Sequence, residues 1–457
     1  MTRRTLLGSL LGVAAARGQE QPLDRFGGWR GVRFEASGYF RLEKKERWWL
    51  VTPEGNAFLS FGLNHAEPGL LRQSYNREHW LKTFGGEAGV LRGFRAHVEA
   101  DLKAFGFNSL GCHNATSRYW QPSIIPYIET FKCVDIDHWK TPRDEDFRDV
   151  YASEFEAYCE TRAVEARLRE RAKDPFLIGY AFTDCPILTE LDAAPRPAVV
   201  QGAPRAGVST WPRVLRNLRG DAAGKQGYVR LMSQRYNGDI RSFNRVYEIE
   251  LGSFDALQNA ANWRPAADPA NAQEARDNQA FLKEILDRYY SSMRSVVRRH
   301  DPNHLILGDK LNGNTDTPDF AVETAARHVD AVFYQWYSYY GEQKTRLDDW
   351  SRLTGKPLFN GDSAYSVPSE QMPRPLGPHS RTHEERAERT LEYARSVFAR
   401  PDFIGWSYCG WMDSWKAMPG KEIRQHAGLQ DPFGQRHAPM LHALSGFARE
   451  LYRVARP

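Results

Sequence analysis

Two aspartates, Asp184 and Asp362, stand where apolar runs of the chain stop at polar residues. This pattern is typical of a buried parallel strand whose C-terminal end reaches an active site. Two carboxyl groups brought together there can hydrolyse a glycosidic bond. Asp362 and Asp184 are therefore the predicted catalytic residues, with Glu67 and Glu190 as alternatives. Because aspartate is one methylene shorter than glutamate, a wide separation and an inverting mechanism are expected.

The other apolar runs end in side chains suited to sugar hydroxyls and ring faces. The candidates for substrate binding are Asn64, His65, His113, Asn114, Lys310, Asn312, Gln335, Trp336, Tyr337, Trp406, Trp411 and Asp413. Each has a structural alternative. The histidines and asparagines could be satisfied polar groups at strand ends, and the tryptophans could pack in the core. Lys310 could form an ion pair with Asp309 or Asp362 inside the fold.

The cysteines give a weaker indication, that of a metal site. Cys112, Cys185 and Cys409 fall at the ends of apolar runs, and with His113 they could bind zinc. No CxxC or HxxxH spacing supports such a site, so no metal and no cofactor are predicted. The chain has five cysteines, an odd number that is too scattered for a disulfide scaffold.

Strands and helices are expected to alternate along most of the chain. The expected strands are residues 57–64, 107–112, 177–184, 305–310, 331–336, 357–362 and 403–409, with a weaker one within 124–134. Helices are expected at 94–105, 153–172, 228–244, 278–299, 344–354, 383–399 and 439–454. Eight strands alternating with helices predict an α/β fold of the (β/α)8 TIM-barrel type. The alternative is a doubly wound open sheet, but no glycine-rich phosphate loop follows any strand.

The chain divides into four predicted parts. Residues 1–19 read as a signal peptide, 20–56 as an N-terminal β-hairpin segment and 57–457 as the barrel. Residues 186–275 form a long insertion after the fourth strand, which is expected to act as a lid or substrate wall.

The first residues have the composition of an export signal. Arg3 and Arg4 precede a short apolar run that ends in small residues at 14–16. The paired arginines are similar to a twin-arginine signal, so the mature protein is expected in the periplasm or outside the cell. The apolar run is too short to cross a bilayer, and no membrane contact is expected after cleavage.

Overall composition is that of a soluble globular protein, with 41% hydrophobic and 26% charged residues. The formal net charge is +5, and no dense run of lysine and arginine occurs. Nucleic acid is therefore not an expected partner.

Four segments occur in an order that defines a resemblance. They are Trp-Trp-Leu-Val-Thr-Pro-Glu-Gly (48–55) leading to Phe-Gly-Leu-Asn (61–64), Asp-Pro-Phe-Leu-Ile-Gly-Tyr (174–180), Tyr-Asn-Gly-Asp-Ile (236–240) with Phe-Asn (243–244), and Gly-Leu-Gln-Asp (428–431) with Gly434. The set resembles the agarase-like glycoside hydrolases of clan A, in the TIM-barrel superfamily. The resemblance covers nearly all of the chain beyond the signal.

The resemblance implies an exported hydrolase that cleaves glycosidic bonds in a galactose-containing poly- or oligosaccharide. In that clan the fourth strand ends Asp-Asn-Glu, with the glutamate as acid/base, whereas this chain has Asp184, Cys185 and Pro186. The seventh strand ends in a nucleophilic glutamate, and Asp362 stands in its place. Two alternatives stay open: a catalytically inactive secreted carbohydrate-binding barrel, and a metal- or thiol-dependent carbohydrate-active enzyme. The oligomeric state is not predicted.

Overall fold

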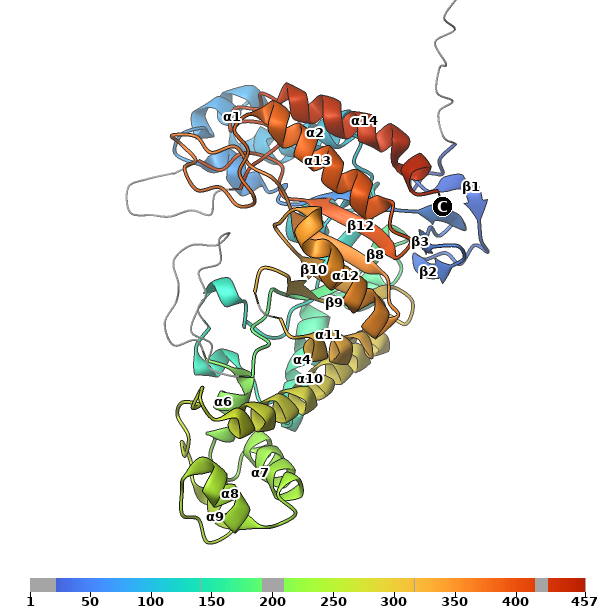
Figure 1. The fold of residues 1–457 in the computed structure, drawn as a ribbon. Helices are drawn as coiled ribbons and strands as arrows, with labels where there is room; N and C mark the ends of the chain where they lie inside the picture. The colour runs from blue at the N-terminus through green and yellow to red at the C-terminus, as the bar shows by residue number, and fades with distance from the viewer. Residues whose placement is uncertain (1–21, 141, 191–208, 316, 416–425, 457) are drawn as a thin grey trace, which may run out of the picture.

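Eight parallel strands close into a barrel at the centre of the molecule (Figure 1). The computed structural model describes residues 22–140, 142–190, 209–315, 317–415 and 426–456. The barrel strands are β5 (Ser60–Leu63), β6 (Ser109–Leu110), β7 (Tyr127–Thr130), β8 (Leu177–Asp184), β9 (Leu305–Asn312), β10 (Val332–Gln335), β11 (Leu358–Ser363) and β12 (Phe403–Tyr408). β12 pairs with β5 to close the ring, which confirms the predicted TIM barrel. The predicted signal peptide lies outside the described residues.

Helices cover the outside of the barrel between successive strands. The main ones are α1 (Arg77–Phe84), α2 (Glu87–Phe105), α3 (Thr116–Tyr119), α4 (Ser153–Glu165), α5 (Leu168–Arg171), α10 (Ala272–His300), α11 (Asp319–Ala326), α12 (Tyr340–Thr354), α13 (His383–Phe398) and α14 (Ala438–Val454). The described residues also form four short 3-10 helices: η1 (Pro68–Arg72), η2 (Cys112–Asn114), η3 (His138–Lys140) and η4 (Asp144–Asp146). α10 buries an apolar stripe, with Phe281, Leu282, Ile285, Tyr289, Met293 and Val296 all in the core.

Two predicted helices are each broken into a pair. The helix expected at 153–172 splits into α4 and α5 at Arg167, which has a φ of 56°. The helix expected at 228–244 splits at Asn237 and Gly238, whose φ values are 51° and 75°. Left-handed residues end a helix whatever the hydrophobic period around them, because they turn the chain out of the helical path. The apolar pattern continues across both breaks, so the sequence alone predicted one continuous helix in each case.

The N-terminal segment is larger than a hairpin. The predicted turn at residues 53–56 joins β3 (Trp48–Val51) to β4 (Asn56–Phe58). β1 (Trp29–Arg33) and β2 (Arg41–Lys44) extend this pair into an antiparallel sheet of order β1-β4-β3-β2. Figure 1 shows the sheet beside the C-terminal end of α14.

A buried arginine fastens this sheet to the barrel. Arg47 is 2% exposed and donates to the backbone oxygens of Phe398, Phe403 and Ala455 at 2.9, 2.6 and 2.9 Å. Burial lowers the pKa of Arg47 to about 10, so its guanidinium stays charged at neutral pH. One side chain therefore links the β2–β3 turn to α13, β12 and the end of α14.

The insertion after β8 forms a helical subdomain of α6 (Trp211–Arg216), α7 (Ala223–Arg235), α8 (Ile240–Tyr247) and α9 (Phe254–Asn259). It packs on the first turns of α10 through buried charges: Arg216 donates to Glu274 at 2.8 Å, and Asp277 accepts from Arg235, Tyr236 and Tyr247. Figure 1 places α7 to α9 beyond one end of α10, far from α13 and α14. Residues 191–208, where a lid was expected to begin, lie outside the described part, so the lid stays a prediction.

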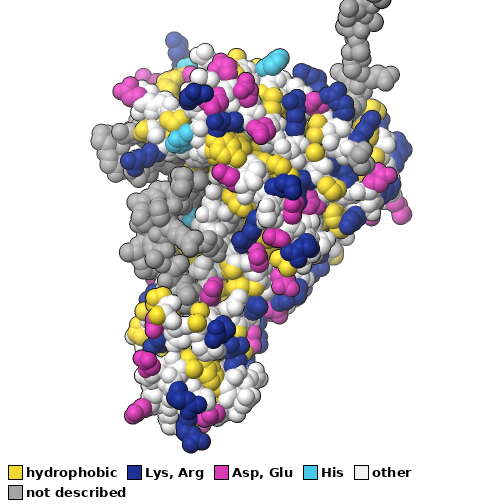
Figure 2. Space-filling view, in the orientation of Figure 1, with side chains coloured by type: hydrophobic (Ala, Val, Ile, Leu, Met, Phe, Trp, Pro, Cys, Tyr) yellow, Lys and Arg dark blue, Asp and Glu magenta, His cyan; other side chains and the backbone are white. Residues whose placement is uncertain are grey.

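The described surface carries charges of both signs. Figure 2 shows lysines and arginines interspersed with aspartates and glutamates over the face in view. Within the described ranges, no helix is both long enough and apolar enough to cross a membrane.

Replacing Arg47 with methionine is expected to destabilise the fold by about 3 kcal/mol, because three buried carbonyl oxygens lose their donor. Urea unfolding followed by circular dichroism measures the change. Arg33→Met is the matched control, since the Arg33 side chain is exposed, and it is expected to change stability by less than about 0.5 kcal/mol. Equal effects of the two substitutions would contradict the role given to Arg47.

Candidate active site

The ammonium group of Lys310 holds the two predicted catalytic carboxylates together. Its Nζ lies 2.9 Å from Oδ1 of Asp184 and 3.0 Å from Oδ2 of Asp362. Lys310 and Asp184 are direct neighbours across the β8–β9 pair, which is why their side chains meet. The two carboxylate oxygens can be no further apart than the sum of these distances. Lys310 therefore forms the ion pair with Asp362 that was considered as a structural alternative to substrate binding, and Asp184 shares it.

Asp362 is buried and held in a fixed orientation. Its side chain is 5% exposed, and Oδ1 accepts a hydrogen bond of 2.9 Å from Nδ2 of Asn64. The amide of Asn64 also donates to the backbone oxygen of Gly361 at 2.7 Å. Gly111 leaves the room for this amide, because a Cβ there would lie 2.0 Å from Oδ1 of Asn64. β5, β6 and β11 together therefore set the position of Asp362.

Both carboxylates are ionised. Burial by itself raises the pKa of Asp362, but the positive charge of Lys310, together with the neighbouring His65 and His113, outweighs it and holds the pKa well below its usual range. Burial also raises the pKa of Asp184, but the charge and hydrogen bond of Lys310, with a contribution from His113, lower it below its usual value. Asp184 is more open, with its side chain 21% exposed, and its Oδ2 accepts a 3.1 Å hydrogen bond from Nε1 of Trp139. Neither aspartate holds a proton at neutral pH.

His113 lies against the same cluster as a neutral imidazole. Its Nε2 contacts Nζ of Lys310 and lies 3.7 Å from Asp362 and 3.9 Å from Asp184. Burial, followed by the charge of Lys310, lowers the pKa of His113 to about 3. The ring of His113 stacks on His65 with centroids 4.7 Å apart, and His65 in turn faces His426 at 4.2 Å. The end of the barrel at which Asp184, Lys310 and Asp362 lie is called the barrel mouth below. Three imidazoles therefore line one wall of this mouth.

Asp309 has a raised pKa but does not belong to the mouth. Burial raises its pKa to about 6, and its carboxylate accepts from the hydroxyls of Tyr290 at 2.6 Å and Tyr289 at 3.0 Å. These tyrosines belong to α10, which packs on the outside of the barrel. Lys310 therefore does not pair with Asp309, the second partner considered from the sequence.

The predicted substrate-binding residues divide into groups. Four lie at the carboxylates: Asn64, His65, His113 and Lys310. Three more lie on the neighbouring strand ends: Asn312, Gln335 and the half-buried Trp336. Tyr337, which follows them, is 3% exposed, so its ring is not open to a ligand.

Four other candidates are occupied within the fold, which corrects the expectation that they bind substrate. Trp406 and Trp411 are fully buried, and their Nε1 atoms donate to Ser363 and Asp101. Asn114 satisfies the backbone of Leu63, Ala66 and Gly111. Asp413 accepts from the backbone N–H of Gly428 at 2.6 Å and contacts His437 at 3.0 Å. Strand-end position was the signal for all four, and packing directs their side chains away from the mouth.

Two residues at the site were not predicted from the sequence: Trp139 and His426. Trp139 lies in η3 just beyond β7, and an aromatic residue after a strand end could have signalled it. His426 lies far beyond the end of β12 in sequence, so no spacing rule could have placed it beside His65.

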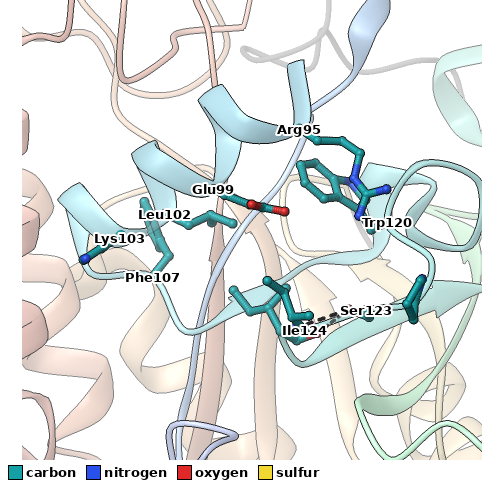
Figure 3. Close-up of a pocket in the computed structure, with 10 residues that line it drawn as sticks. Arg95, Glu99, Leu102, Lys103, Phe107, Trp120, Ser123 and Ile124 are labelled. Atoms are coloured by element: carbon teal, nitrogen blue, oxygen red, sulfur yellow. Dashed lines mark hydrogen bonds between the residues drawn. The ribbon is translucent and has the colours of Figure 1, made fainter. Parts of the chain in front are cut away.

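A pocket of about 160 Å³ opens beside Asp184, between Trp139, His113, Lys132 and Lys140. A separate groove of about 220 Å³ lies between α2 and the segment leading into β7, with Trp120 and Ile124 on its wall (Figure 3). The groove lies where a barrel strand begins, and it shares no residue with the carboxylate cluster. Barrel chemistry occurs at the carboxyl ends of the strands, so the candidate active site is the mouth and not this groove.

Comparison with known proteins places the chain near the agarases. No family model matches it. It is 19% identical to β-agarase B of Vibrio sp. (strain JT0107) over 501 residues, covering 94% of this chain and 50% of that protein. It is 21% identical to β-agarase A of the same strain, covering 80% and 41%. The chain thus spans about half the length of the curated relatives that it matches.

Solved structures show the same fold. The chain superposes on an exo-β-agarase with a TM-score of 0.75 and 19% identity, covering 96% of this chain and 69% of that one. The agarase AgWH50C gives a TM-score of 0.75 at 17% identity, covering 95% and 68%. At this level of identity the likeness establishes the barrel architecture.

Replacing Lys310 with methionine is expected to destabilise the protein by about 3–5 kcal/mol at pH 7, because two buried carboxylates lose their counter-ion. With the lysine gone, burial raises both aspartate pKa values above their unfolded values, so lowering the pH toward 4 protonates them and shrinks the loss. Urea unfolding at both pH values measures this. Lys344→Met, at an exposed pair with Asp348, should leave stability unchanged. A loss independent of pH would contradict the charge argument.

Asp309→Asn is expected to gain stability relative to the wild type as the pH rises. The pKa of Asp309 in the folded protein, about 6, lies above its ordinary value of 3.8. The stability that Asp309 contributes is therefore fully present below about pH 4, where its carboxyl group is protonated, and is lost as the pH rises through 6. Between pH 4 and 7.5 the difference in unfolding free energy should shift by up to about 3 kcal/mol in favour of the variant. A difference that stays constant across this range would contradict the raised pKa.

Proposed function

We propose that this protein is an exported glycoside hydrolase that cleaves a galactose-containing polysaccharide in the barrel mouth. The observation that carries the proposal is the convergence of Asp184 and Asp362, from β8 and β11, on the single ammonium group of Lys310. The similarity to two β-agarases supports the substrate class. Export rests on the composition of residues 1–19 alone.

Asp362 has the properties of a nucleophile. It is ionised, buried and oriented by Asn64, and a carboxylate in this state can attack the anomeric carbon of a bound sugar. The shared contact with Lys310 brings Asp184 close to it, and this closeness supports a retaining course over the inverting course that the short aspartate side chains suggested. Trp139, beside Asp184, and Trp336, at the end of β10, are half-buried, and aromatic rings of this kind can stack on sugar rings.

A second candidate function is carbohydrate binding without hydrolysis. Lys310 neutralises both carboxylates, and neither of them keeps a proton for the leaving oxygen. A glycosidase needs such a proton donor, with a pKa raised toward the working pH. The two functions make different predictions for the same substrate.

Wild-type protein is expected to release new reducing ends from agarose, and Asp362→Asn is expected to lose at least about a thousandfold in kcat, since the nucleophile is removed. Asp309→Asn is the matched control: it is also a buried barrel aspartate, but it faces α10, and it should keep wild-type activity.

A cellulose arm in the same assay tests whether galactose is required. Release of reducing ends from agarose by Asp362→Asn at the wild-type rate would show that Asp362 is not the nucleophile. Agarose binding by wild type and variant alike, without release by either, would overturn hydrolysis in favour of the binding function.

A further inference from the structure

Three metal-ligating side chains meet next to the carboxylate cluster. The ligand atoms of His65, Cys409 and His426 all lie within 4.8 Å of one another. The Sγ of Cys409 is 3.0 Å from Nδ1 of His426. His65 follows β5 and Cys409 follows β12, and these strands are direct neighbours where the barrel closes. The closure of the barrel therefore assembles the group, and His426 completes it from the segment that follows.

A second observation points to a missing ligand. The Nε2 atom of His65 is buried and has no hydrogen-bond partner among the described residues. Leaving a buried polar atom unsatisfied costs about 1–3 kcal/mol, and such an atom in a native fold calls for an explanation. Oδ2 of Asp362 lies 3.9 Å from this atom, beyond hydrogen-bonding distance.

The cysteines do not assemble as the sequence suggested. Among the described residues, the two groups able to hold a metal are His65 with Cys409 and His426, and His65 with His113 and Asp362. Cys112 and Cys185 belong to neither. Both groups contain His65, so they form one continuous cluster around that ring.

We propose that His65, Cys409 and His426 bind one zinc ion and leave its fourth position open toward Asp362. One thiolate and two imidazoles are a donor set that zinc accepts, and three protein ligands with a free position are the arrangement of catalytic zinc sites.

The role of the zinc ion rests on the proposed function. Water bound to zinc in the fourth position would titrate near neutral pH. Asp362 would bond to the anomeric carbon as the bond from that carbon to the leaving oxygen breaks. A zinc ion held by His65, Cys409 and His426 would supply an acidic water able to give the leaving oxygen its proton, which solvent would replace. The ion would thereby supply the proton donor that Pro186 cannot.

The test is metal binding by the purified full chain after treatment with a chelator. Co²⁺ serves as the spectroscopic probe, and Zn²⁺ as the competitor. The expected result is one Co²⁺ per chain, with a thiolate-to-cobalt charge-transfer band and the intense visible bands of a four-coordinate ion, both abolished by one equivalent of Zn²⁺.

Cys409→Ser should lose the charge-transfer band and weaken binding by at least roughly 100-fold. His426→Gln should weaken binding similarly, and it keeps the test valid if the buried serine disturbs folding. Cys112→Ser is the matched control, because Cys112 is a buried thiol of the same mouth outside the ligand set; it should bind like wild type.

Absence of stoichiometric binding by the wild type, or a band that survives in Cys409→Ser, would overturn the zinc site. Because these measurements need no polysaccharide, they separate the two proposals. Zinc binding without agarose cleavage would keep the site and overturn the hydrolase.

Discussion

The structure depends on one lysine between two buried carboxylates. Removing three charged groups from water is expensive, and the cost is met only because Lys310 lies within hydrogen-bonding distance of both Asp184 and Asp362. That arrangement requires β8, β9 and β11 to be in correct register around a closed barrel. The charge cluster and the closed barrel therefore stabilise each other, and the chemistry of the mouth follows from this arrangement.

The same ion pairs define what the mouth can do. Lys310 favours the ionised form of both aspartates, and burial together with Lys310 keeps His113 neutral, so the cluster offers hydrogen-bond acceptors but no carboxylic acid. Under the proposed function, the proton for the leaving group would come from a neighbouring site. The imidazole row that ends at His426 and Cys409 is the adjacent group with the right chemistry.

The rest of the chain supports the mouth from a distance. At the start of β12, away from the mouth, Arg47 joins the N-terminal sheet to β12 and to the last helices. Buried charges also fasten the α6–α9 subdomain to α10, where Arg216 meets Glu274. In both places a long side chain reaches several backbone or carboxylate acceptors, so single residues join whole elements. Such contacts favour a rigid frame around the active site.

The sequence by itself determined the architecture and the main members of the cluster. Apolar runs alternating with amphipathic helices are local patterns, and they identified the barrel, Asp184, Asp362 and Lys310. It could not determine where Trp406 and Trp411 point, because a strand-end position does not reveal which face of the wall a side chain takes. Nor could it place His426 beside His65, since that contact arises only when β12 pairs with β5. Local propensity fixes elements, whereas protonation and ligand geometry depend on neighbours distant in the chain, so only the tertiary structure decided them.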